Sequence, residues 1–243
     1  MSAILKGLTG FTPTVFVEGP AGSLPGHLAG FTVSVLCKIT TQTGSDKVLF
    51  AQRESHNASL GWEICTLSTN ATMVFSVGSA TGNASAQVSI TKDDINKLLL
   101  VTGVWAADAS PLAILYMRRN LCSQASLSAG VYTPTAATAK PSIGHNSLRN
   151  YDSGSSVVIY GVYYAPGIAR ISHIYAQHDA VVVTERIQPC PGMPGTLIDL
   201  TADIEENGGS LPTTFKNRST AGVDFISASG IPAISPQYAR HWG

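Results

Sequence analysis

The acidic side chains bear first on catalysis, because two facing carboxylates can serve as the acid and the base of a glycosidase. The chain has 15 Asp and Glu residues among 243. The adjacent pairs are Asp93-Asp94, at a predicted helix start, and Glu205-Glu206, in a polar segment. Carboxylates at a helix start favour the positive end of the helix dipole. We therefore expect capping and solvated charges here, and no catalytic pair.

Histidines and nucleophile motifs point the same way. His173 and His178 are five residues apart, which on a helix turns them about 140° from each other and away from the i, i+4 spacing of a metal pair. The sequence contains no Gly-x-Ser-x-Gly elbow and no P-loop or dinucleotide glycine pattern. We expect a protein that is not an enzyme and has no metal site.

Two polar and aromatic clusters remain as candidates for binding. The first lies in a predicted loop before a strand, where binding residues are often carried, and consists of Arg149, Asn150, Tyr151 and Asp152. We predict that it contacts a ligand or a partner. The second lies in the C-terminal tail and consists of Tyr238, His241 and Trp242. Aromatic side chains often anchor interfaces, so we predict that this cluster is an assembly anchor, with docking onto its own domain as the alternative.

Composition narrows the class of protein. The net charge is zero, charged residues make up 12% of the chain and hydrophobic residues 44%. A neutral chain has no surplus of basic residues for a phosphate backbone, so we expect no nucleic-acid partner. No apolar run approaches the roughly 18 residues of a membrane-spanning helix. The expected product is a globular protein with a surface poor in charge and rich in hydroxyl groups.

The cysteines and the N-terminus indicate the compartment. Cys37, Cys65, Cys122 and Cys190 show no Cys-x-x-Cys spacing, which disfavours zinc. Buried free thiols are expected, and a disulfide between some pair stays open. Lys6 interrupts the only apolar segment at the N-terminus, so we predict synthesis in the cytoplasm without a signal peptide.

Strands dominate the pattern along the chain. In residues 31–39, apolar side chains alternate with polar ones, except at Leu36, and this period of two is typical of a strand. The other predicted strands are 47–52, 62–67, 72–77, 86–90, 98–105, 112–118 and 156–164. Trp62 and Trp105 fall inside these patterns and are expected in the core. Many short strands separated by turns predict an all-β sandwich.

Helices and terminal segments complete the plan. A short helical turn is predicted from the capping pattern at Thr91, and a second helix from near Pro166 through Gln177. Proline and glycine are frequent after residue 187, which excludes a second regular core there. We predict an N-terminal extension over 1–29, a sandwich domain over 30–187 and an extended C-terminal arm over 188–243.

The order of four segments resembles the concanavalin A-like and laminin G-like jelly-roll family. The first is strand 31–39. Residues 98–105 and 115–120 are similar to the family's hairpin of V-x-W-D-G followed by L-Y-V-N-G. Residues 141–146 resemble its L-x-I-G-x-N strand, and residues 157–175 its closing strand and helical turn. The resemblance implies a jelly roll of two antiparallel sheets over about residues 30–178.

The resemblance also implies partners. Ala106 stands where the family has Asp, and Arg119-Asn120 where it has Asn-Gly, so a calcium site is unsupported and no cofactor is expected. Low-charge jelly rolls with arms look like the decoration, fibre or tail proteins of tailed bacteriophages. The first hypothesis is therefore a structural component on a virion surface that binds copies of itself or neighbouring proteins. The alternative is a lectin or adhesin that binds surface glycans through rim loops.

Overall fold

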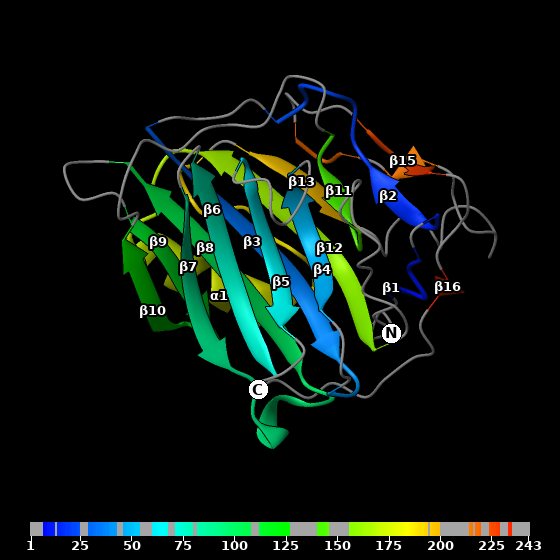
Figure 1. The fold of residues 1–243 in the computed structure, drawn as a ribbon, viewed down its shortest axis with the longest axis horizontal. Coiled ribbons are helices and arrows are strands. Elements are labelled where there is room, and N and C mark those ends of the chain that lie inside the picture. The colour runs from blue at the N-terminus through cyan, green and yellow to red at the C-terminus, as the bar shows by residue number, and fades with distance from the viewer. Residues whose placement is uncertain are drawn as a thin grey trace.

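Two antiparallel sheets stack face to face, as Figure 1 shows, which confirms the predicted all-β sandwich. The structure is a computed structural model that describes residues 7–12, 14–24, 29–42, 46–53, 60–67, 71–79, 82–107, 112–126, 140–145, 156–193, 195–199, 214–215, 217–219, 224–228 and 233–234. Within this part of the chain, no helix is long and apolar enough to cross a membrane.

The first sheet contains the long strands that the alternating pattern predicts. Across the sheet the order is β10 (Asn120–Ser126), β9 (Leu112–Met117), β8 (Leu98–Ala106), β3 (Gly30–Ile39), β12 (Val157–Pro166), β1 (Leu8–Thr9) and β16 (Ala233–Ile234), with β13 (Thr196–Asp199) also paired to β12. The strands at the centre, β3 and β12, come from opposite ends of the predicted sandwich domain. Their pairing therefore closes the jelly-roll-like arrangement.

The second sheet lies in front of the first in Figure 1. Its order is β14 (Thr214–Phe215), β15 (Phe225–Ala228), β2 (Phe16–Glu18), β11 (Ser142–Ile143), β4 (Lys47–Gln52), β5 (Trp62–Leu67), β6 (Thr72–Ser79) and β7 (Gly82–Ser89). The strands β4 to β7 form a meander of sequential antiparallel neighbours, as expected for short strands separated by turn residues.

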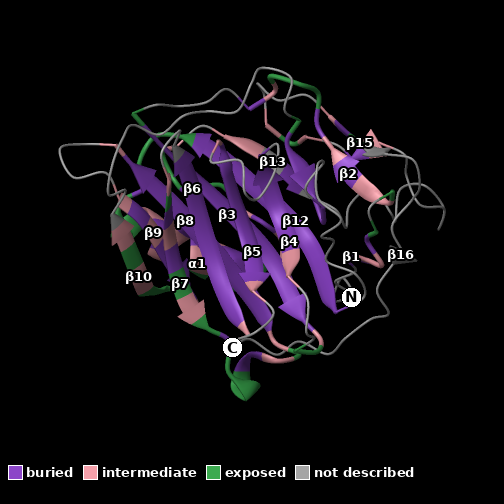
Figure 2. Ribbon diagram, viewed as in Figure 1, coloured by how far each residue is buried: buried purple, intermediate pink, exposed green. Residues whose placement is uncertain are grey.

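The core fills the space between the sheets. Figure 2 shows the central strands of both sheets as buried. Both tryptophans that the pattern places in the core, Trp62 and Trp105, are buried. The Trp62 ring lies 5.8 Å from the ring of Tyr164 and nearly parallel to it. Because Trp62 belongs to the second sheet and Tyr164 to the first, this pair joins the two layers.

A second apolar layer explains the irregular position in the pattern of β3. Helix α1 (Ile171–Thr184) packs on the outer face of the first sheet, behind it in Figure 1. Leu36 faces this layer and belongs to the same buried cluster as Ile174 and Val181 of the helix. The one apolar exception on the polar side of β3 is therefore covered by α1.

Buried hydrogen bonds also fix α1 on the sheet. The Ser34 hydroxyl donates to Gln177 Oε1 at 3.0 Å, and Gln177 Nε2 donates to the Gln188 carbonyl at 2.6 Å. Gln177 is fully buried, so its amide needs such partners. The helix continues to Thr184, beyond the predicted end at Gln177, because burial of Val181 outweighs the weak helix propensity of the run 181–183.

The terminal segments add strands to both sheets. Strands β1 and β2 come from the predicted N-terminal extension, and β13 to β16 from the predicted C-terminal arm. Ile198, Phe215 and Phe225 from the arm are buried in the core. The described portions of both segments thus pack on the chain's own sandwich. The division at residues 29 and 187 stays a prediction.

The predicted helical turn is a 3-10 helix, η1 (Lys92–Asp94). The Asp94 carboxylate accepts hydrogen bonds from the backbone N–H and the hydroxyl of Thr91, both at 2.7 Å. It also pairs with the Arg118 guanidinium. This confirms that Asp94 has a capping role.

Candidate functional site

The two clusters predicted from the sequence lie outside the described residues. These are Arg149, Asn150, Tyr151 and Asp152, and Tyr238, His241 and Trp242. The described residues beside the first cluster do identify one end of the sandwich. Gly144 N–H donates to the Leu49 carbonyl near the start of β4, and Val157 pairs with Ile39 at the end of β3. Both flanks of the predicted loop therefore lie at the same end.

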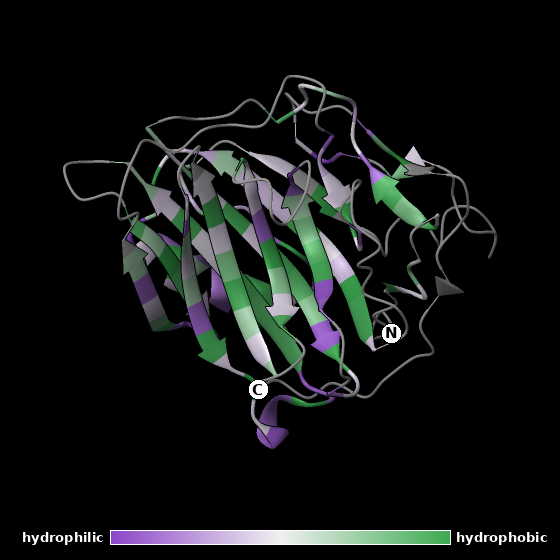
Figure 3. Cartoon of the chain, in the orientation of Figure 1, coloured by the Kyte–Doolittle hydropathy of each residue, from purple (hydrophilic) through white to green (hydrophobic). Residues whose placement is uncertain are grey.

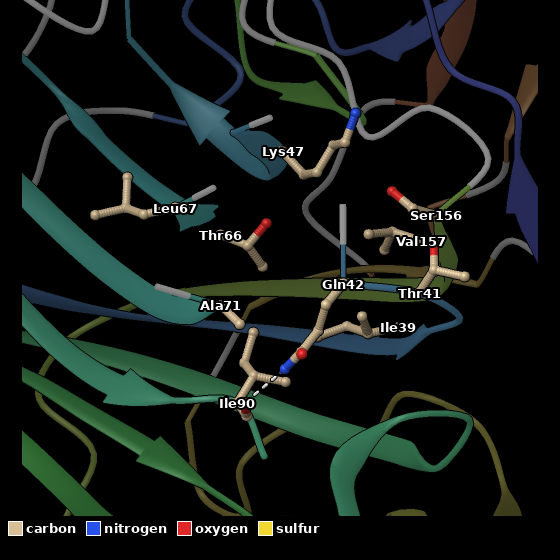
Figure 4. A pocket seen from close by; sticks show the side chains of 10 residues that line it. All are labelled: Ile39, Thr41, Gln42, Lys47, Thr66, Leu67, Ala71, Ile90, Ser156 and Val157. Atoms are coloured by element: carbon tan, nitrogen blue, oxygen red, sulfur yellow. Dashed lines mark hydrogen bonds between the residues drawn. The ribbon is translucent and has the colours of Figure 1, made fainter. Parts of the chain in front are cut away.

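A hollow of about 290 Å³, partly open to solvent, occupies this end of the sandwich. We call it the end pocket (Figure 4), and its described lining residues are Ile39, Thr41, Gln42, Lys47, Thr66, Leu67, Ala71, Ile90, Ser156 and Val157. This volume includes open solvent, so the enclosed part of the hollow is far smaller than the roughly 300–1,000 Å³ of small-ligand sites. It has room for one small substituent of a ligand that lies over its mouth.

Strand register brings the pocket residues together. Val157 is the partner of Ile39 in the first sheet, and Lys47 is the partner of Thr66 in the second. Ile39, Val157 and Ile90 are buried members of the core cluster and form an aliphatic floor. The pocket is therefore the open mouth of the core, between the inner faces of the two sheets.

Polar groups surround this floor. The hydroxyls of Thr66 and Ser156 lie on opposite sides of the hollow in Figure 4. Gln42 Nε2 donates to the Ile90 carbonyl at 2.8 Å, and Lys47 is half-buried at the rim. None of the ten lining residues is acidic or aromatic. The pocket can exchange hydrogen bonds with hydroxyl groups, and its described lining contains no carboxylate or imidazole for acid–base catalysis.

A buried charge cluster lies on the outer face of the second sheet. Arg53 Nη1 donates to Glu63 Oε1 at 2.7 Å, and Arg53 Nη2 donates to Asn83 Oδ1 at 2.6 Å. Both charged side chains are almost fully buried. Register places Ser142 and Ala51 between Glu18 and Glu63.

The spacing of these carboxylates differs from that of a glycosidase. Three strand spacings separate Glu18 from Glu63, or about 14 Å. Hydrolytic carboxylate pairs are about 5–9.5 Å apart. Glu18 is moreover paired with Lys140. These two glutamates are therefore structural charges.

Metal ligands and thiols are also placed by the structure. Among the described residues, no group of three or more His, Cys, Asp and Glu side chains can hold a metal ion. Ala106 offers no side-chain oxygen, so the described residues give no support to the calcium position raised by the family resemblance.

All four cysteines are free. Burial raises the pKa of Cys37 to about 12 and that of Cys190 to about 12, so both thiols stay protonated near neutral pH.

The end pocket was missed in the sequence because its residues are ordinary ones. They are hydroxyl and aliphatic side chains at the ends of strands, and only register brings them together. The usable signal was positional, since Ile39, Lys47 and Ser156 each end or begin a predicted strand. The ends of predicted strands that meet between two sheets are therefore candidate positions for a pocket of this kind.

Comparisons with known proteins give a shared fold. No family model matches the chain, and no curated protein is similar to it in sequence. A proposed carbohydrate-binding protein from Bacteroides ovatus matches 98% of this chain and 61% of its own, with a TM-score of 0.61 and 9% identity. Two structures of the botulinum neurotoxin D binding domain match 64% of this chain, with TM-scores of 0.51 and 0.52 and 12% identity. The chain spans 37% and 38% of those domains. At such identities the likeness shows the β-sandwich alone.

Proposed function

We propose that this protein is a non-catalytic, lectin-like module that binds carbohydrate in the end pocket. The observation that carries this proposal is the pocket itself, a hollow with an aliphatic floor and hydroxyl and amide walls. The shared fold with a proposed carbohydrate-binding protein over nearly the whole chain supports it. The binding domains of botulinum neurotoxin add a second instance of this sandwich in a protein that binds a receptor.

A sugar ring matches the chemistry of the pocket. Its hydroxyl groups need donors and acceptors, which Thr41, Thr66 and Ser156 supply. Its C–H faces need apolar surface, which the floor supplies. Lectins also use an aromatic plate, and Tyr151 in the loop between His145 and Ser156 is our candidate for it. The finer assignment to the concanavalin A-like and laminin G-like family is part of this proposal.

The assembly role is the second candidate. The neutral, low-charge composition favours close packing against other proteins. However, the described strands of both terminal segments pair with the chain's own sheets, so these strands are not available to a neighbour. We therefore rank a virion decoration, fibre or tail protein, made in the cytoplasm and bound to its own copies or to neighbouring proteins, below the lectin.

A glycan array with the full chain tests the proposal. We expect binding to a restricted set of glycans, and loss of most of that binding in Thr66→Val, which keeps the shape of the side chain and removes its hydroxyl. Tyr151→Ala and Asp152→Ala test the predicted loop contact. The control is Thr72→Val, at a buried position in β6 outside the pocket. An array on which the native chain binds nothing, or on which Thr66→Val and Thr72→Val behave alike, would overturn the pocket assignment.

A further inference from the structure

We infer that the end pocket selects sugars that carry a methyl group, either a 6-deoxy sugar or an N-acetyl sugar. The shared chemistry is one apolar methyl group on a ring that is otherwise covered with hydroxyls. This inference rests on the proposed function and names the class of sugar. It follows from the uneven distribution of polar groups in the pocket.

The floor offers an apolar seat for a methyl group. Ile39, Ile90 and Val157 are nearly inaccessible to solvent, with exposed fractions of 3%, 5% and 1%. They are continuous with the core of the sandwich. They leave little accessible surface of their own, so only a group about as small as a methyl can contact them from the hollow, and such a group is removed from water. The half-buried Leu67 and Ala71 extend the same apolar surface toward the rim.

The backbone groups of the floor already have partners within the chain. The Ile39 carbonyl accepts from Asn96 N–H at 2.8 Å, and the Val157 carbonyl accepts from the Thr9 hydroxyl at 2.9 Å. The Ile90 carbonyl accepts from Gln42 Nε2, and Ile90 N–H donates to the Ala71 carbonyl at 2.6 Å. A ligand hydroxyl on the floor would thus lose water and meet groups that are already paired.

The polar groups lie around the floor instead. Thr66 and Ser156 present hydroxyls from the two sides, and Thr41 and Lys47 are more exposed, near the rim. A ring whose hydroxyls face these walls places one substituent on the floor. A methyl group in that position is stabilised by its burial. A hydroxymethyl group would lose the hydrogen bonds of its hydroxyl to water without replacement, which costs free energy. The walls therefore recognise a sugar, and the floor discriminates between sugars.

Titrations followed by NMR of the full chain test this preference. Each of two series, gluco and galacto, contains the parent hexose, its 6-deoxy form and its 2-N-acetyl form. We expect at least one methyl-bearing sugar to bind about fivefold more tightly than its parent, the gain for burying about one methyl group. The 6-deoxy and N-acetyl arms show which source supplies the methyl.

Val157→Thr tests the floor with little change in shape. It places a hydroxyl on the floor, and we expect the preference over the parent sugar to fall to about twofold or less. The matched control is Val162→Thr, on the same strand, with the same 1% exposure and outside the pocket lining. The control should lose similar stability and keep the full preference.

The outcomes separate this inference from the proposed function. If parent and methyl-bearing sugars bind equally, or if Val157→Thr keeps the preference, the inference is overturned while the sugar site stands. If no sugar of either series binds, both the inference and the proposed function are overturned. A preference that is lost only in Val157→Thr supports both.

Discussion

At the scale of single residues, the second sheet contains an ion pair, Arg53–Glu63, whose two charges depend on each other because both are buried. Its two charges are almost fully buried, and Asn83 completes the cluster. A buried ion pair contributes little net stability, but removal of one partner leaves an uncompensated charge. The cluster therefore fixes the geometry of β4, β5 and β7 more than it stabilises them.

Removal of the arginine gives a specific prediction. Arg53→Met should lower the free energy of unfolding by about 3–5 kcal/mol, because the Glu63 carboxylate stays buried without its partner. The double change Arg53→Met with Glu63→Leu should recover part of that loss. Lys140→Met, which breaks a partly exposed pair with Glu18, should cost less than about 1 kcal/mol. Urea denaturation checks all three, and equal losses in Arg53→Met and Lys140→Met would contradict the prediction.

The buried thiols predict how stability depends on alkaline pH. Burial raises the pKa of both Cys37 and Cys190 from 9.0 to about 12 in the folded chain. The unfolded chain therefore loses these protons first, so stability is intact below pH 9 and falls between pH 9 and 12. Each thiol contributes at most about 1.4 kcal/mol per pH unit.

Denaturation at pH 8, 9 and 10 measures this slope. The double variant Cys37→Ala with Cys190→Ala should start from a lower stability and decline less steeply between pH 9 and 10. The half-buried Cys122, changed to Ala, is the control and should alter the slope less. A slope that is unchanged in the double variant would show that other groups cause the alkaline loss.

At the scale of elements, the turn between β9 and β10 carries two arginines in the left-handed backbone region. Arg118 has φ 54° and Arg119 has φ 70°, values that Asn and Gly adopt more easily. The family resemblance placed this turn one residue later, at Arg119-Asn120. The side chains account for the residue types, since Arg118 pairs with Asp94, and Arg119 lies over the Tyr175 ring.

The two arginines should differ when each is changed to glycine. Arg118→Gly should destabilise the fold by about 2 kcal/mol, because the fully buried Asp94 carboxylate loses its partner. Arg119→Gly should be neutral to within about 0.5 kcal/mol. Its exposed pair with Asp179 and its contact with Tyr175 are each worth at most about 1 kcal/mol, and relief of the backbone offsets them. Thermal unfolding of both variants checks the order, and a reversed order would contradict it.

The sequence predicted the bounds of a strand correctly where the strand is long enough to show a pattern and turn residues flank it. Strands β4 and β5 have the predicted bounds because turn residues flank both short, largely apolar segments. The prediction failed for β1, β14 and β16, which have two residues each and so show no period, whereas the equally short β11 was expected only from the family resemblance over residues 141–146. The prediction also ended helix α1 too early, because the three valines at 181–183 favour a strand over a helix. Tertiary pairing supplied this missing information, as it did for the end pocket.

At the scale of the whole molecule, apolar side chains from the C-terminal segment help to fill the core of the sandwich. The outer face of the first sheet is covered by α1, while Figure 3 shows apolar positions along the strands of both sheets. Ile198, Phe215 and Phe225, all beyond residue 187, are fully buried. The described strands of the C-terminal segment are therefore part of the fold.

Two truncations separate the folded part of this segment from its tail. A chain that ends at residue 195 loses β13 to β16 and three buried side chains, each worth about 2–5 kcal/mol, which together approach the whole stability of a domain. We expect it to be unfolded or insoluble.

A chain that ends at residue 234 keeps every described strand and should unfold like the full chain. If Tyr238, His241 and Trp242 anchor a neighbouring copy, light scattering should show the full chain as the larger species. Equal sizes for the full chain and the chain ending at 234 would contradict the anchor, and a stable chain ending at 195 would contradict the role of the terminal strands.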